Sequence, residues 1–190
     1  MKALLILLGF LFLCQFSQAQ GGFNLMAGSE KYIEVIHLAY SDSFCYHYRD
    51  YRITVYHPST TDGFIRIVDS KNQTRTLVTD DTTYFYGIMN HKMVIDNGTS
   101  SIRMLSVYDL ETMDLIFSSS YKDQIIAKGQ TIEYDFPISY SDEPFIRPDC
   151  PEKKQIEDSD GVVGYIEPRD YKVDTNEVIK AGPIRCVFFE

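Results

Sequence analysis

Short runs of alternating apolar and polar residues recur along most of this chain, and this pattern constrains the fold more than any other feature. Runs such as Phe64 to Val68, Thr83 to Ile88 and Ile102 to Tyr108 are typical of strands that bury one face. They begin at intervals of about ten residues, and polar turn clusters stand between them. Helical periodicity is hard to find. The pattern predicts an all-β protein, built as an antiparallel β-sandwich or barrel.

Two local segments refine this expectation. Met93 to Ile95 runs into Asn97-Gly98, and an Asn-Gly pair readily supplies the two positive-φ residues of a type I′ hairpin turn. Residues 106–116 resemble one hairpin of a propeller blade, so a small propeller-like β fold is the alternative. Because a blade takes about 40–45 residues and the segment does not recur convincingly, we prefer the sandwich or barrel.

The first 19 residues have the three parts of a secretory signal peptide. Lys2 supplies the positive charge, an apolar run follows from Ala3 to Leu13, and Ser17-Gln18-Ala19 is a small-x-small cleavage signal. A retained membrane anchor is the alternative, but a spanning helix needs about 20 apolar residues. We therefore expect cleavage after Ala19 and a mature protein that is secreted, periplasmic or at the cell surface. We expect no membrane insertion of the mature chain.

Residues 20–190 have the size of a single domain, and we expect one β domain. From about Pro137 the regular alternation gives way to prolines and acidic residues, so 137–190 is predicted to be a loop-rich extension on the same core. The full chain has a net charge of −9 and shows no basic cluster, which argues against nucleic acid as a partner.

Three cysteines remain after removal of the leader: Cys45, Cys150 and Cys186. An exported protein meets an oxidising compartment, where a disulfide is expected. Cys150 with Cys186 is the preferred pair, because both lie in the C-terminal quarter and the bond would fasten a proline-rich loop. Cys45 with Cys186 is the alternative pairing.

Tyrosines crowd the segment around residues 44–56, and Tyr46, Tyr48 and Tyr51 are our candidate binding residues. A tyrosine ring offers a rigid apolar plane with a polar tip, which suits a protein or glycan partner. The alternative is that the aromatic face of this strand belongs to the core.

Cys45, His47 and His57 are the candidate metal ligands, since a thiolate with imidazoles is a set that zinc or copper accepts. No closely spaced second cysteine or histidine pair reinforces the site. A structural role for Cys45 therefore remains the other interpretation.

A weaker candidate is a calcium loop, in which Asp158, Asp160 and Glu167 match positions three, five and twelve of an EF-hand loop. The first ligand position is Ile156, which has no side-chain oxygen, so an EF-hand is not expected. An irregular calcium-binding loop is the remaining form of this hypothesis.

The chain has no glycine-rich phosphate loop, no Gly-x-Ser-x-Gly elbow and no His-Glu-x-x-His motif, and the sequence identifies no catalytic residue. We expect a non-enzymatic binding or interaction module that recognises a protein or glycan partner, with no cofactor. One alternative is an exported hydrolase with a cleft of carboxylates or histidines. The other is a metal-binding protein that uses Cys45 and His47.

Overall fold

The computed structural model describes residues 25–26, 28–38, 43–56, 63–138, 146–159 and 161–189 of the chain. The predicted signal peptide lies outside these residues. The described elements follow one another as β1 (Glu34–Leu38), β2 (Ser43–His47), β3 (Tyr51–Tyr56), β4 (Gly63–Asp69), β5 (Thr74–Thr79), β6 (Thr83–Met89), β7 (Lys92–Asn97), β8 (Ile102–Asp109), β9 (Leu115–Lys128), β10 (Thr131–Ile138), α1 (Lys153–Asp158), β11 (Val162–Lys172), β12 (Glu177–Lys180) and β13 (Arg185–Phe189).

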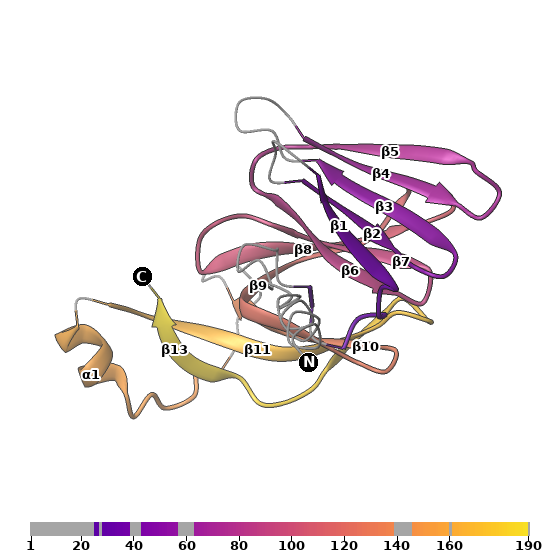
Figure 1. Cartoon of the computed structure of the whole chain (residues 1–190). Helices are drawn as coiled ribbons and strands as arrows, with labels where there is room; N and C mark the ends of the chain where they lie inside the picture. Colours follow the sequence, from indigo (N-terminus) through magenta and orange to yellow (C-terminus); the bar gives the residue numbers. More distant parts are fainter. Residues whose placement is uncertain are drawn as a thin grey trace, which may run out of the picture.

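All strand pairs are antiparallel, and the strands form two sheets (Figure 1). The smaller sheet is a meander in the order β1-β2-β3-β4-β5, and its pairings among the described residues run without a register shift. The larger sheet has the order β12-β11-β10-β9-β8-β7-β6, and β13 pairs with β11 beside β12. Register shifts interrupt three of its pairings, and such irregularities increase the local twist of a sheet.

The two sheets pack face to face through a core of aliphatic and aromatic side chains. On β2, Phe44 and Tyr46 point into this core, and Phe85 of β6 meets the Tyr46 ring at a centroid distance of 5.3 Å. The branched residues of β3 and β4 and the inner side chains of β7 complete it: Ile53, Val55, Ile65, Ile67, Met93 and Ile95. The prediction of an all-β sandwich is confirmed, and the propeller alternative is not the arrangement found.

A second core lies on the opposite face of the larger sheet, lined by Leu105, Val107, Tyr121, Ile132 and Tyr171 among others. The segment before β1 contributes to it, because Met26 is buried there and donates its N–H to the Tyr86 carbonyl at 2.6 Å. The middle strands of the larger sheet are thus buried on both faces.

One charged group sits inside this second core. The Asp96 carboxylate is fully buried and accepts a 2.5 Å hydrogen bond from the Tyr121 hydroxyl. It also pairs with the Arg103 guanidinium at 2.8 Å. Burial raises the pKa of Asp96, while the Tyr121 hydrogen bond and Arg103 oppose that rise. The sequence reasoning did not identify this cluster, whose members come from three different strands.

The hairpin turn expected at Asn97-Gly98 is wrong in detail. Asn97 ends β7, only Gly98 of the pair has a positive φ (114°), and the return strand starts at Ile102. The Asn97 side chain is used to bond Thr83 and Ser106 instead. The two-residue turn with both φ angles positive is at Asn90-His91, between β6 and β7.

The C-terminal part forms an arm that extends from the sandwich (Figure 1). It consists of α1, the first half of β11 and β13, which pairs with β11 from Val162 to Ile166. A disulfide between Cys150 and Cys186 ties the segment before α1 to β13, as predicted. Only Ile156 is buried in α1, so the helix packs against β11 through a small apolar contact.

Candidate interaction site

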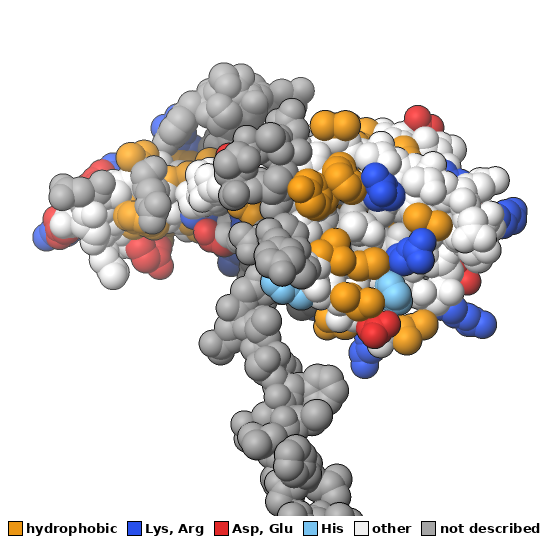
Figure 2. Space-filling model, turned by 45° about the horizontal axis from the view of Figure 1, so that its top comes forward, with side chains coloured by type: hydrophobic (Ala, Val, Ile, Leu, Met, Phe, Trp, Pro, Cys, Tyr) orange, Lys and Arg blue, Asp and Glu red, His pale blue; other side chains and the backbone are white. Residues whose placement is uncertain are grey.

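The edge strand β1 exposes the most concentrated set of apolar side chains in the smaller sheet. Among the described residues β1 pairs only with β2, so the backbone groups along its other side face outward. Ile33, just before the strand, is 74% exposed, and Tyr32, Val35 and Ile36 are each exposed by about two fifths. Figure 2 shows hydrophobic side chains together with Lys and Arg on the lobe that the smaller sheet forms.

β1 has no lysine or proline and no register shift in its pairing, and its one charged residue is Glu34 at its start. Edge strands are usually protected by lysine, proline, a bulge or very short length. The sequence of β1 is Glu-Val-Ile-His-Leu, and its pairing with β2 runs in one register from Glu34 to Leu38. By contrast, the opposite edge strand β5 is mostly Thr and Arg, and β12 has four residues including Lys180.

The two faces of β1 offer different surroundings to an added strand. Ile36 lies opposite Cys45 on the outer face, where Glu34 also meets His47 with a 3.3 Å separation between Oε2 and Nδ1. On the inner face Val35 lies opposite Tyr46, whose ring the Tyr32 ring meets edge-on at 5.7 Å. An extended segment added here would find aliphatic side chains on both faces.

The candidate binding tyrosines lie mainly in the interior. Tyr46 and Tyr48 are buried in the core between the sheets, and burial raises the pKa of Tyr46 to about 12, with Tyr32 adding to the rise. Burial also raises the pKa of Tyr48. Tyr51 is partly exposed, and its hydroxyl lies 3.0 Å from Nδ1 of His91. The aromatic face of β2 is therefore core, the alternative interpretation of this strand.

The candidate metal ligands Cys45 and His47 share the outer face of β2, while His57 lies outside the described residues. The Cys45 thiol is buried and accepts a hydrogen bond from the Thr54 hydroxyl at 3.7 Å. In the described part of the chain, neither residue joins a group of three donors close enough to hold one metal ion.

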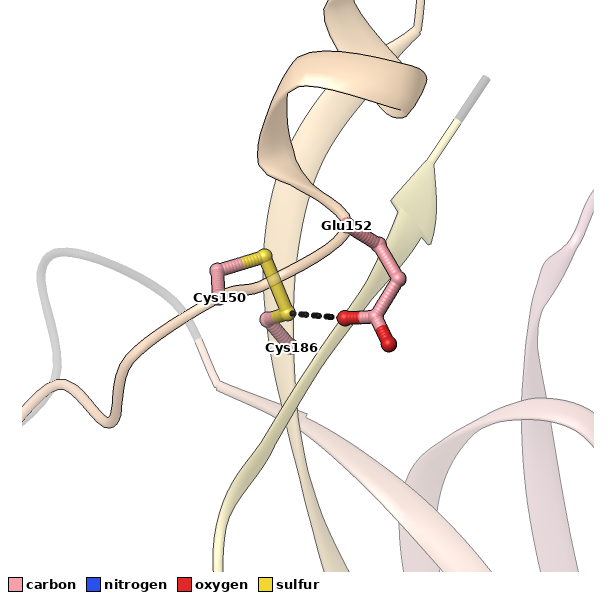
Figure 3. A group of neighbouring side chains, drawn as sticks. All are labelled: Cys150, Glu152 and Cys186. Atoms are coloured by element: carbon pink, nitrogen blue, oxygen red, sulfur yellow. Dashed lines mark hydrogen bonds between the residues drawn. A yellow bond between two sulfur atoms is a disulfide. The ribbon is translucent and has the colours of Figure 1, made fainter.

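One group of three donors does occur in the described ranges, at the disulfide (Figure 3). A carboxylate oxygen of Glu152 lies 3.6 Å from the Cys186 sulfur. Since a disulfide sulfur carries no proton, this is a contact between the carboxylate and the sulfur. The spacing of the two cysteines predicts their pairing, but nothing in the sequence pattern points to Glu152.

The calcium hypothesis finds one of its acids engaged elsewhere. Glu167 is buried in β11, and its two oxygens pair with Arg169 and Lys180, both at 2.7 Å. Burial raises the pKa of Glu167, but these two cations outweigh burial and hold it below its ordinary value. Asp158 ends α1, and Asp160 lies outside the described residues.

The hydrolase hypothesis requires a cleft with free titratable groups. An open groove of about 490 Å³ crosses β10 and β11, lined by Glu133, Asp135, Asp170 and Arg185 among others. Each of the three carboxylates is paired: Asp135 with Arg185 at 2.7 Å, Glu133 with Lys128 at 2.8 Å and Asp170 with Lys172 at 3.3 Å. The three carboxylates that line this open groove are thus all engaged in ion pairs.

Comparisons with known proteins do not assign the chain to a family. No family model, no curated protein and no solved structure matches it. No helix in the described ranges is long and apolar enough to cross a membrane.

Proposed function

We propose that this protein is an exported, non-enzymatic binding module that captures an extended segment of a partner protein along the free edge of β1. The observation that carries the proposal is the exposed aliphatic edge from Ile33 to Ile36, next to a row of backbone groups that no described residue pairs. Export is supported by the signal-like leader and by the disulfide, which forms in oxidising compartments.

Strand addition explains how such an edge binds. The main-chain N–H and C=O groups of the partner continue the ladder and provide affinity, while alternate side chains provide selectivity. Because Ile36 lines one face and Val35 the other, the favoured partner segment has apolar residues on both faces. A protein suits this edge better than a glycan, because the exposed side chains at Ile33, Val35 and Ile36 are aliphatic and Tyr32 is the one partly exposed ring among the described residues 32–36.

The test is a selection from a displayed library of random 12-residue peptides on the full mature chain, followed by affinity measurements. Ile36→Lys places a charge at the edge where the added strand would pack, so selected peptides should bind this variant at least tenfold more weakly. Val78→Lys is the control, because Val78 is also an exposed aliphatic residue (73%, against 41% for Ile36) and lies on the opposite edge strand β5. Equal binding to both variants, or no enrichment of peptides, would contradict the proposal.

A further inference from the structure

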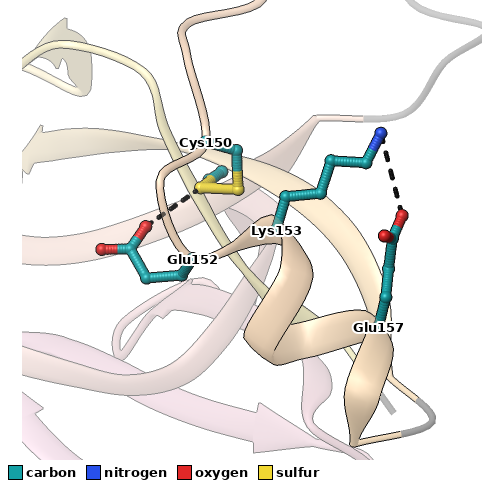
Figure 4. The surroundings of a disulfide bond; sticks show 5 residues. Cys150, Glu152, Lys153 and Glu157 are labelled. Carbon is teal, nitrogen blue, oxygen red and sulfur yellow. Dashed lines mark hydrogen bonds and ion pairs between the residues drawn. A yellow bond between two sulfur atoms is a disulfide. The ribbon is translucent and has the colours of Figure 1, made fainter.

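The side chain of Glu152 points to the disulfide (Figure 3), although its position at the start of α1 would allow it to cap the helix. Glu152 is the N-cap residue of α1, yet its carboxylate makes no capping hydrogen bond. It approaches the sulfur of Cys186 instead, and the donor atoms of Glu152, Cys150 and Cys186 all lie within 4.8 Å of one another (Figure 3). The neighbouring Lys153 pairs with Glu157 at 3.7 Å and so does not occupy Glu152 (Figure 4).

We propose that Cys150, Glu152 and Cys186 form a binding site for a zinc-like divalent cation when the disulfide is reduced. Two thiolates and one carboxylate are a donor set that Zn²⁺ accepts, and a water molecule would complete a tetrahedron. Both cysteines are half-buried and Glu152 is exposed, so an ion can reach the three donors from solvent.

One separation between donor atoms already suits a tetrahedral ion, and a second must increase after reduction. With Zn–S near 2.3 Å and Zn–O near 2.0 Å, a tetrahedral ion sets a sulfur-to-oxygen separation of about 3.5 Å. The Glu152 oxygen and the Cys186 sulfur are 3.6 Å apart in the structure. The two sulfurs must separate to about 3.8 Å on the same reasoning. Rotation of the cysteine side chains can provide this, since their Cα atoms are 5.6 Å apart.

Reduction and metal binding replace the disulfide by the bound ion in two steps. A dithiol reductant gives two electrons and two protons to the sulfurs of Cys150 and Cys186 and becomes a disulfide itself. The cation then displaces the two thiol protons and binds the resulting thiolates together with the Glu152 carboxylate. The segment before α1 and β13 are thus held together by the ion in place of the sulfur–sulfur bond.

The experiment is a Co²⁺ titration of the full mature chain, reduced with an excess of a non-coordinating phosphine and compared with the oxidised protein. Thiolate coordination to Co²⁺ gives an intense near-ultraviolet charge-transfer band, so the readout reports sulfur ligation directly. We expect one equivalent of Co²⁺ in the reduced protein, competition by Zn²⁺, and no band in the oxidised protein. Cys150→Ser and Cys186→Ser should each lose the one-equivalent band, whereas Cys45→Ser should keep it.

Glu152→Gln tests the third ligand and should weaken Co²⁺ binding about tenfold or more while keeping a sulfur band. Glu157→Gln is the matched control, because Glu157 is an exposed acid of the same helix outside the donor group. The proposal is overturned if the reduced chain shows no band, if the band survives in Cys150→Ser, or if Glu152→Gln binds Co²⁺ as tightly as Glu157→Gln. Circular dichroism of each reduced variant verifies that the sheets are intact.

Discussion

Loss of the disulfide should loosen the C-terminal arm and leave the sandwich intact. The bond joins residues 36 apart in the sequence, and the chain-entropy relation gives a stabilisation of about 4 kcal/mol for a loop of that length. Burial in the arm is confined to Tyr165 and Ile166 of β11 and to Ile156 of α1, and β13 has no fully buried residue. The core between the sheets does not include the arm.

The perturbation is the double variant Cys150→Ser with Cys186→Ser, measured by hydrogen exchange resolved to peptides. We expect amides of α1, β13 and the Val162–Ile166 half of β11 to exchange faster by up to about 10²- to 10³-fold, the factor that corresponds to about 3–4 kcal/mol. Amides of β7 and β8, each of which pairs with a strand on both sides in the larger sheet, should keep their wild-type protection.

Two outcomes would refute this reasoning. If β13 keeps its protection in the double variant, the arm is held by contacts other than the disulfide. If β7 and β8 lose as much protection as β13, the arm and the sandwich unfold as one cooperative unit.

Three further predictions concern the stability of the sandwich, and each is tested by measuring the free energy of unfolding in urea. Tyr121→Phe removes the 2.5 Å hydrogen bond to the buried Asp96 carboxylate and should lower the free energy of unfolding by about 1–3 kcal/mol. An unchanged free energy of unfolding would mean that Arg103 alone satisfies the carboxylate. The pKa of Glu167 is lowered from its ordinary 4.5 in the folded state, so its contribution to stability is present above pH 4.5 and is lost as the pH falls through the folded pKa. Glu167→Gln should therefore reduce the loss of stability at acid pH. An unchanged acid dependence would assign that loss to other groups. Ile65→Ala empties a fully buried core position and should cost about 2–5 kcal/mol, whereas Val78→Ala on the exposed edge should change stability by less than about 0.5 kcal/mol; similar losses would place Val78 in a buried environment.

The strand pattern could be predicted well from the sequence because most strands bury one face. Phe64 to Val68, Thr83 to Ile88 and Ile102 to Tyr108 coincide closely with β4, β6 and β8. In the longest strand, β9, the alternating pattern predicts a strand over Met113 to Ser118, but the strand continues to Lys128. Its second half contributes Tyr121, Ile125 and Ala127 to the second core, and three consecutive serines at 118–120 interrupt the alternation just before it.

The candidate site was less predictable, because its properties depend on which strand is at an edge. The alternation around residues 31–39 predicts a strand, but only the sheet order shows that β1 has one neighbour. The exposure of the tyrosines around residues 44–56 could not be predicted either, because the same alternation fits an exposed aromatic surface and a buried one. In the structure, packing against Phe85 buries Tyr46. The contact of Glu152 with Cys186 joins residues 34 apart in sequence, and the disulfide between Cys150 and Cys186 holds the two segments together there.

The most direct test of strand capture at β1 is hydrogen exchange of the mature chain with and without a bound peptide from the displayed library. If the peptide extends the smaller sheet, amides between Glu34 and Leu38 that point away from β2 become strongly protected, while those of β5 at the opposite edge are unchanged. If β1 exchanges at the same rate with and without peptide while another region becomes protected, binding occurs elsewhere and the account of the edge is wrong.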